Sequence, residues 1–326
     1  SMARGWAERG LVESAFLDWL EDEGRVSFPW SMIDKITPHP SERVQEELGR
    51  LGVADMAIAR TNTGTLIAPF VNAEITEYLV LEDAFPNGRP ALEGAGVYLT
   101  DRTTVEKAEK MKVGTCLNPL HTALAVYGCL LGYTSIAAEM GDADLKALVE
   151  HIAAESLPVV EDPGILSPRA FIDEVLHERF PNPAIPDTPQ RIAADTSQKL
   201  PVRYGGTLRR YARQSEQALA GLEFAPLVFA GWCRYLLGVD DRGNAMPVSP
   251  DPMLPQLQAH LKGIEVGRPD SLAGQLRPIL SNAALFGVDL YAAGLGERTE
   301  EMFRDMLAGP GAVRATLHRN CACKQP

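Results

Sequence analysis

Residues 118–133, NPLHTALAVYGCLLGY, decide the fold class of this sequence, because apolar side chains fill turn after turn of a helix-sized segment. Asn is favoured as a helix N-cap and Pro at the first helical position, so Asn118-Pro119 indicates a helix start. The helical spacing continues to about Ala138. The stretch therefore predicts a helix that runs from Pro119 to about Ala138 and is capped by the Asn118 side chain.

The same periodicity recurs through the rest of the chain after Asp101. Six more segments place apolar residues at helical intervals between Pro or Gly residues; they are residues 142–155, 168–180, 207–222, 225–238, 251–263 and 298–309. We therefore expect at least seven helices, which form a helical domain.

The first hundred residues show a different, mixed pattern. A helix is expected over 4–23 and another after Ser41, whereas the proline-rich residues 26–40 are expected to run extended over a surface. Three short runs, 65–70, 77–83 and 96–101, are typical of strands. The sequence thus predicts a mainly α protein that begins with a smaller α/β segment.

The composition argues against two classes of partner. The 326 residues include 31 Lys and Arg against 43 Asp and Glu, a net charge of −12, and no run of basic residues stands out. Nucleic acid and anionic membranes are therefore not expected as partners. No apolar run reaches the roughly 18 residues that a membrane span needs, and no charged-then-apolar leader opens the sequence.

The five cysteines do not indicate a disulfide framework or a metal site. Cys116, Cys129 and Cys233 lie inside apolar helical patterns, and Cys321-Ala-Cys323 is a single pair that indicates a frayed tail more than a metal site. We expect no metal and a reducing, cytoplasmic location.

Residues 111–121, MKVGTCLNPLH, bring Lys112, Asn118 and His121 together in an apolar surrounding. His121 would lie in the first turn of the predicted helix, near its unpaired N–H groups, where a partly anionic oxygen is stabilised. The Asn118 amide could cap the helix and still donate to a ligand, and the long Lys112 side chain could reach the same point. Spacing alone nevertheless favours a capping Asn, a core His and a surface Lys.

The common nucleotide and hydrolase signatures are absent. The sequence contains no G-x-G-x-x-G, G-x-x-x-x-G-K-[ST], G-x-S-x-G or H-E-x-x-H.

Several stretches together resemble the long-chain mannitol dehydrogenase family of polyol and sugar-acid oxidoreductases. They follow the family's order, extend over most of residues 26–240, and read SFPWSMIDKITP, YLVLEDAFPNGRP, MKVGTCLNPLHTALAVYGCLLGY, RIAADTSQKLPVR and WCRYLLGVDD. The resemblance implies an NAD-dependent enzyme that interconverts a ketose or keto sugar acid with its polyol or aldonate. The variants present favour fructuronate and mannonate as substrates, with mannitol and fructose next.

The resemblance also implies roles for individual residues. The family's catalytic motif is Lys, four residues, Asn, two residues, His; Asn118 and His121 match it, but Lys112 lies one residue too early and Val113 takes the lysine's position. A one-residue bulge before the helix would restore the spacing, with Lys110 as the less favoured substitute. The lysine would take the hydroxyl proton while hydride leaves for the nicotinamide, the asparagine would stabilise the oxyanion, and the histidine would hold a substrate hydroxyl or the lysine.

Residues outside this motif acquire roles from the same resemblance. Arg191 and Lys199 would contact polyol hydroxyls or a sugar-acid carboxylate. Asp34 and Lys35, in the first matching stretch, are interpreted as structural.

The resemblance finally predicts how the chain is divided. Residues 1–103 would be the C-terminal remnant of a Rossmann-like dinucleotide-binding domain, and residues 104–326 a helical substrate domain. Uncovered strand edges and apolar surface at residues 55–100 would then favour self-association. Two alternatives stay open: a substrate-binding or interaction fragment without redox activity, and a cofactor-binding half supplied by a separate polypeptide.

Overall fold

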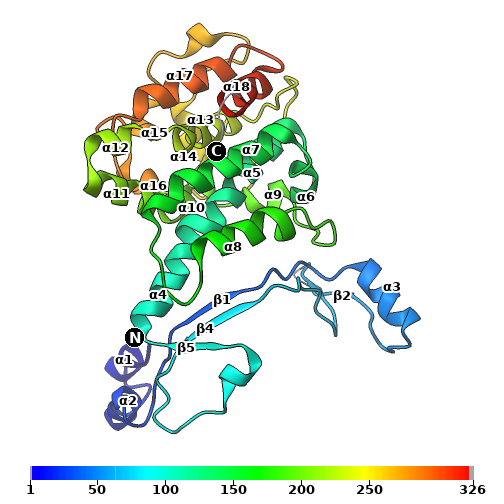
Figure 1. Cartoon of the computed structure of the whole chain (residues 1–326), viewed down its shortest axis with the longest axis vertical. Helices are drawn as coiled ribbons and strands as arrows, with labels where there is room; N and C mark the ends of the chain where they lie inside the picture. The colour runs from blue at the N-terminus through cyan, green and yellow to red at the C-terminus, as the bar shows by residue number, and fades with distance from the viewer. Residues whose placement is uncertain (1, 63, 323–326) are drawn as a thin grey trace.

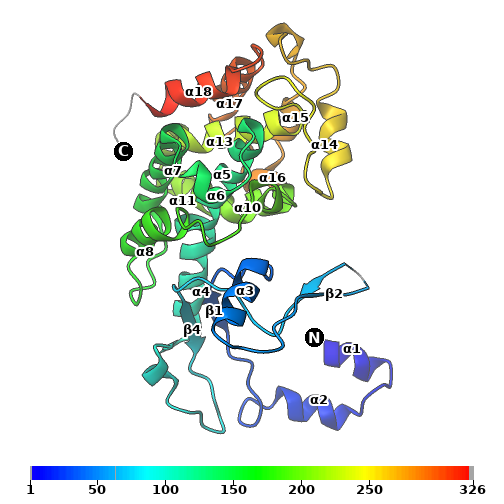
Figure 2. The same cartoon turned by 90° about the vertical axis from the view of Figure 1, so that its right-hand side faces the viewer.

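A small α/β segment and a large helical lobe make up the protein, as the computed structural model shows for residues 2–62 and 64–322 (Figures 1 and 2). The long helix α4 (Arg102–Met111) leads from the segment into the lobe (Figure 1). The prediction of a mainly helical protein with a small α/β segment is confirmed.

The α/β segment contains a three-stranded sheet in the order β1-β4-β5. In this sheet β1 (Ser31–Asp34) pairs antiparallel with β4 (Tyr78–Glu82), and β4 pairs in parallel with β5 (Tyr98–Thr100). The remaining elements are β2 (Ala59–Arg60), β3 (Leu66–Ile67), α1 (Met2–Glu8), α2 (Ser14–Glu21), α3 (Glu42–Arg50) and the 3₁₀ turn η1 (Leu92–Ala95).

One prediction for this segment was wrong and another was incomplete. The single helix expected over 4–23 is broken into α1 and α2, because Gly10 adopts a positive φ of 69° between them. The extended stretch over 26–40 contains a true strand: Met32 of β1 is buried opposite Val80 of β4. A local pattern interrupted by prolines could not reveal this pairing, because the partner strand lies almost fifty residues later.

Helix α4 joins the sheet to the lobe through packing. The Asp101 side chain accepts a hydrogen bond from the backbone N–H of Thr104 and so caps α4. Val105, Ala108 and Met111 are buried in one hydrophobic core with Met32 and Val80 of the sheet. The sheet therefore lies directly against the helix that leads to the residues of interest.

The lobe is built from short helices around α5 (Asn118–Leu131). The others are η2 (Lys112–Cys116), α6 (Ile136–Glu139), α7 (Ala143–Ser156), η3 (Leu157–Val159), α8 (Pro168–Glu174), η4 (Val175–Arg179), α9 (Pro189–Ile192), α10 (Thr196–Arg203), α11 (Gly205–Gln214), α12 (Glu216–Ala220), α13 (Phe224–Tyr235), α14 (Leu254–His260), η5 (Pro269–Ser271), α15 (Arg277–Leu280), α16 (Ala283–Phe286), α17 (Gly296–Met306) and α18 (Ala312–Cys321). Of these, η2 and η4 are π-helical turns, and η3 and η5 are 3₁₀ turns.

Helix α5 is the centre of the lobe, since it is buried along its length and packs against α7, α9 and α13. The helices α5 and α13 approach closely because Gly231 has no side chain: a Cβ there would lie 2.7 Å from the ring of Tyr127. The helix predicted to reach Ala138 instead ends at Leu131, because Gly132 adopts a left-handed conformation with φ of 80°.

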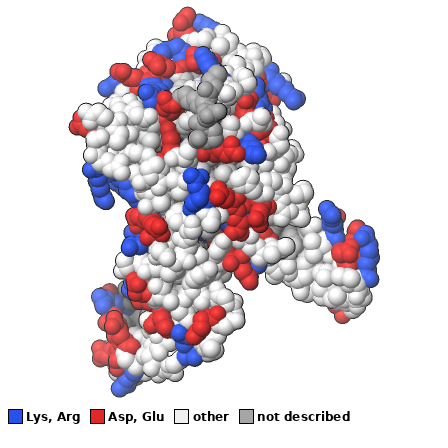
Figure 3. Space-filling model, viewed as in Figure 1, with Lys and Arg blue, Asp and Glu red and all other residues white. Residues whose placement is uncertain are grey.

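Surface charge and surface apolarity are distributed differently. On the face shown in Figure 3, acidic and basic side chains are interspersed over the lobe. Large apolar side chains that are exposed lie, with the exception of Val202, before residue 101. In the described residues no helix is both long and apolar enough to cross a membrane. Of the cysteines in the described residues, Cys116, Cys129 and Cys233 are buried free thiols and Cys321 is buried; Cys323 of the tail pair lies outside the described residues.

Candidate active site at the start of helix α5

The lysine of the candidate site lies in a π-helical turn. Residues Lys112–Cys116 form η2, directly between α4 and α5. A π turn is an α-helix with one residue inserted, and such turns occur often at functional sites. The structure therefore contains the one-residue bulge that the spacing of Lys112 and Asn118 required.

The Lys112 amine points toward strand β1. Its Nζ donates a 2.7 Å hydrogen bond to the carbonyl of Ile33 and lies 3.0 Å from Oδ1 of Asp34. The side chain remains 17% exposed. Asp34, interpreted from the sequence as structural, thus holds the candidate base.

Asp34 belongs to a buried ion network with Arg179 of η4. The Arg179 guanidinium donates to both oxygens of Asp34 and both oxygens of Glu74. Burial raises the pKa of Asp34, but the hydrogen bonds and charges of Arg179 and Lys112 outweigh it and leave the pKa below its usual value. Asp34 is therefore ionised at neutral pH and available to position Lys112.

The prediction that the Asn118 side chain caps α5 was wrong. Asn118 is the first residue of the helix, Leu117 is the N-cap, and no side-chain cap bond forms. The physical reason is that η2 runs almost directly into α5, with Leu117 N–H bonded to the Lys112 carbonyl and His121 N–H bonded to the Leu117 carbonyl. The Asn118 Oδ1 is instead buried without a partner in the described chain. Such an orphaned polar atom fits a site that receives a ligand hydroxyl.

His121 is held in a neutral form by its surroundings. Its Nε2 lies 3.0 Å from Oδ2 of Asp187, and its ring packs against Phe180 at 5.1 Å between centroids. Burial lowers the pKa of His121 more than the neighbouring Asp187 raises it, so the imidazole is uncharged at neutral pH. A neutral imidazole can accept from or donate to a hydroxyl.

Arg191 and Lys199 lie in the same neighbourhood but already have partners. Arg191, half exposed, binds Oδ1 of Asp187 through Nε at 3.0 Å and Nη2 at 2.5 Å. The Lys199 amine donates to the carbonyls of Ile192 and Ala194, at 3.0 and 2.5 Å. Lys199 thereby holds the turn between α9 and α10.

Arg179 connects the lysine and histidine sides of the site. It binds Asp34, which holds Lys112, and it also lines a small hollow together with His121, Phe180 and Asp187. Lys112 and His121 themselves share no hydrogen bond or ion pair in the described part of the chain. The structure thus brings both to the region around Arg179.

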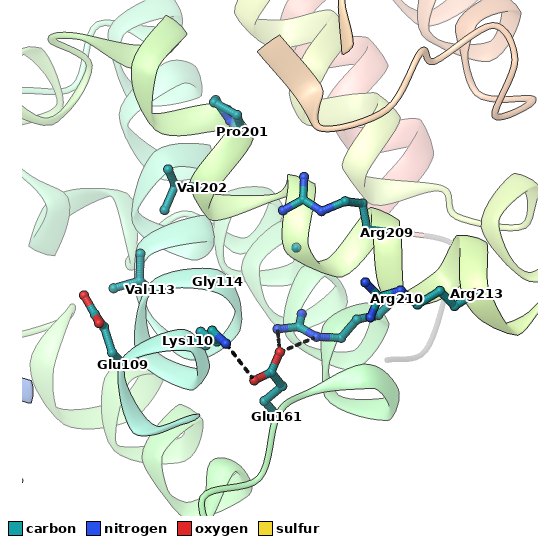
Figure 4. Close-up of a pocket in the computed structure, with 11 residues that line it drawn as sticks. Glu109, Lys110, Val113, Gly114, Glu161, Pro201, Val202, Arg209, Arg210 and Arg213 are labelled. Atoms are coloured by element: carbon teal, nitrogen blue, oxygen red, sulfur yellow. Dashed lines mark hydrogen bonds and ion pairs between the residues drawn. The ribbon is translucent and has the colours of Figure 1, made fainter. Parts of the chain in front are cut away.

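Lys110, the alternative lysine, faces a different groove. This groove has a volume of about 470 Å³. In Figure 4, Lys110 and Arg210 both reach toward Glu161, and the side chains of Arg209 and Arg213 contribute further positive charge. The Lys110 Nζ lies 3.7 Å from Glu161 and 3.8 Å from Glu106. Its partner Glu161 lines this groove, whereas Asp34 and His121 do not, which favours Lys112 as the site residue.

Several residues of this region escaped the sequence analysis. Asp187, Arg179, Glu74 and Arg203 carry no local signature, because the partner that brings each of them into this region lies far along the chain. Within the described residues no group of three or more His, Cys, Asp or Glu side chains could hold a metal ion.

A sequence family model, the mannitol dehydrogenase C-terminal domain, matches residues 104–299. The chain belongs to the mannitol dehydrogenase family. The match begins two residues after the start of α4 and includes η2, α5, α9 and α10, so all the candidate side chains from Lys112 to Arg203 lie within it.

Individual members of the mannitol dehydrogenase family are similar over most of this chain. D-mannonate oxidoreductase of Thermotoga maritima is 57% identical over 314 residues, which are 96% of this chain and 58% of that protein. Mannitol 2-dehydrogenase of Aspergillus niger is 32% identical over 293 residues, 83% of this chain and 50% of that protein. The chain therefore spans between half and three fifths of the length of these relatives.

A solved structure of the family shares the fold. The Pseudomonas fluorescens mannitol 2-dehydrogenase ternary complex with NAD and D-mannitol aligns with a TM-score of 0.70 and 30% sequence identity, over 98% of this chain and 58% of that one.

Proposed function

We propose that this chain carries the substrate-binding half of an NAD-dependent oxidoreductase that interconverts a keto sugar acid with its aldonate. In this proposal residues 104–326 form the substrate domain, and residues 1–103 are the C-terminal remnant of the dinucleotide-binding domain. D-fructuronate and D-mannonate are the favoured pair, ahead of D-fructose and D-mannitol, because the relative at 57% identity is a D-mannonate oxidoreductase. What supports the proposal is the set of side chains along η2 and the first turn of α5: an amine held by an ionised carboxylate on η2, and an unpartnered amide oxygen and a neutral imidazole on α5.

Each side chain has a role in oxidation of a secondary alcohol. The Lys112 amine accepts the hydroxyl proton as the carbinol carbon releases its hydride, and Asp34 stabilises the ammonium that forms. The Asn118 Nδ2 donates to the oxygen that becomes partly negative, while its Oδ1 accepts from a neighbouring hydroxyl. His121, oriented by Asp187, binds another hydroxyl and fixes the sugar chain.

The hydride acceptor is a nicotinamide cofactor, and we propose that this chain contains little of the half of the protein that binds it. The sequence has no G-x-G-x-x-G, and the parallel strands β4 and β5 are joined through the short η1 turn rather than a crossover helix that could bind a pyrophosphate. The residues present thus fit the substrate side of the reaction, and no step here depends on cofactor contacts.

The test is an assay of the protein expressed from its complete reading frame. We expect D-mannonate-dependent formation of NADH and a lower kcat/KM for D-mannitol. If the protein oxidises D-mannitol but not D-mannonate, its substrate is a polyol rather than an aldonate. No oxidation of any aldonate or polyol with NAD or NADP would refute the proposal.

A second function is favoured by the missing phosphate loop: a sugar-binding or interaction protein without redox activity. Calorimetric titration with NADH of the protein expressed from its complete reading frame separates the two. Absence of binding supports this alternative, whereas clear binding supports a redox enzyme.

Self-association is the accompanying proposal for the α/β segment. Exposed apolar side chains there include Trp6, Trp19, Phe28, Val71 and Ile75, and exposed apolar surface of this kind drives association. We expect light scattering to show a mass that rises with concentration. A constant monomer mass at high concentration would contradict this expectation.

A further inference from the structure

Arg203, the last residue of α10, is a partly buried cation without a counter-ion in the described residues. Its Nη1 donates a 2.6 Å hydrogen bond to Oγ1 of Thr122 and lies 3.5 Å from the Asn118 carbonyl. No carboxylate lies within ion-pair distance of it in residues 2–62 and 64–322. Burial lowers the pKa of Arg203 to about 10, a sign that the surroundings disfavour the charge.

The two fully buried arginines of the described residues, Arg179 and Arg234, have a partner at every nitrogen. Arg179 uses Nε, Nη1 and Nη2 on two carboxylates. Arg234 uses the same three atoms on the carbonyls of Met306, Val239 and Asp240. In Arg203 only Nη1 is used within the described chain, which leaves Nε and Nη2. These two nitrogens form one of the parallel N–H pairs with which a guanidinium binds a carboxylate.

The position of Arg203 is next to the candidate active site. Its two partners, Asn118 and Thr122, lie on the first turn of α5, on either side of His121 in the sequence. A ligand that reaches the orphaned Asn118 Oδ1 therefore lies beside the helical turn that Arg203 contacts.

The charges around Arg203 are predominantly positive. Burial and the positive charge of Arg203 lower the pKa of Lys199, and Arg203 and Arg191 also oppose protonation of His121. Among the acidic groups nearby, Asp187 is already bound to Arg191 and His121, and Asp251 binds the Ser197 N–H and hydroxyl. Asp195 raises the pKa of Lys199 only as a smaller influence. An anionic ligand would offset the cost of an uncompensated buried cation.

We propose that Arg203 binds the carboxylate of the sugar acid through Nε and Nη2 and so selects aldonates and keto sugar acids over neutral polyols and ketoses. This inference rests on the proposed function and adds the residue that sets substrate class. Arg191 and Lys199 already have partners; they add to the positive potential around the site and do not themselves bind the carboxylate.

The experiment compares kcat/KM for D-mannonate and D-mannitol in the protein from the complete reading frame. For Arg203→Met we expect a fall of about 30- to 300-fold with D-mannonate, mainly through KM, and a change of less than about 3-fold with D-mannitol. Arg203→Lys keeps the positive charge but lacks the paired N–H donors of the guanidinium. Its kcat/KM for D-mannonate should therefore lie between those of the unmodified protein and of Arg203→Met. The matched control is Arg213→Met, an exposed arginine of α11, which should behave like the unmodified protein.

The outcomes separate this inference from the proposed function. Equal losses with D-mannonate and D-mannitol would show that Arg203 is only structural and overturn the inference, while the proposed function stands. An unmodified protein that oxidises neither substrate refutes the proposed function, and the inference falls with it. Should the methionine variant fail to fold, as judged by circular dichroism, Arg203→Lys is judged by the same ratio of the two substrates.

Discussion

Replacement of Lys112 by methionine is expected to lower kcat of the oxidoreductase by about 10²- to 10⁴-fold, the usual range for loss of a general base. Methionine retains the length and much of the apolar stem of lysine, so the substitution removes mainly the amine that accepts the proton. The contact with Asp34 is lost as well, but Asp34 keeps both hydrogen bonds to Arg179. Steady-state kinetics with D-mannonate measures the effect.

The chain offers a matched control two residues earlier. Lys110 lies on the same stretch but pairs loosely with Glu106 and Glu161. Lys110→Met should therefore change kcat by less than about 3-fold, the size expected for a weak exposed ion pair. In a Lys112→Ala variant, added methylamine should restore part of the rate. A Lys112→Met enzyme with near-normal kcat, or a larger loss at Lys110, would refute the assignment.

Replacement of Arg179 by methionine is expected to reduce the free energy of unfolding by about 3–5 kcal/mol, the range for breaking one side of a buried ion network. The Arg179 side chain is 2% exposed, and its removal leaves Asp34 and Glu74 buried with less compensation. The network also joins the α/β segment to the lobe, because Asp34 lies in β1 and Arg179 in η4. Urea denaturation measures the loss.

The effect of Arg179→Met should depend on pH in a definite direction. In the unmodified protein the pKa of Asp34 is lowered, so its stabilisation is complete above the usual value near 3.8 and is lost only as the pH falls through the lower folded value. Without Arg179, burial raises the pKa of Asp34, and the variant loses stability as the pH rises through that value. The deficit should therefore be larger at pH 8 than at pH 5.

A surface arginine provides the comparison for this variant. Arg268 pairs with Glu265 three residues away and is 69% exposed. Arg268→Met should cost less than about 1 kcal/mol at either pH. A deficit for Arg179→Met as small as this, or one that shrinks with rising pH, would show that the buried network does not hold β1 and η4 together.

The sequence by itself determined the helical lobe, because the apolar period of segments such as 225–238 is a local property that survives in any helical context. It also determined that Asn118 and His121 lie on the same side of one helix, because residues three positions apart in a helix are neighbours on its surface. Local glycines mattered more than expected: Gly10 and Gly132, both with positive φ, ended helices that the apolar pattern alone extended.

Only the tertiary structure decided which polar groups meet. Lys112 pairs with Asp34, which lies 78 positions earlier, and Asp34 in turn pairs with Arg179. His121 pairs with Asp187. No local pattern in the sequence encodes these pairs. The π turn η2 made Asn118 part of an almost continuous helix, so the cap predicted from Asn-Pro did not form and its oxygen stayed free. Arg203 is a further example. Nothing in the sequence distinguishes it from other arginines, and the proposed binding role follows only from its place beside α5 without a carboxylate partner in the described residues. Burial and partner choice depend on long-range packing, which is why these features required the folded chain.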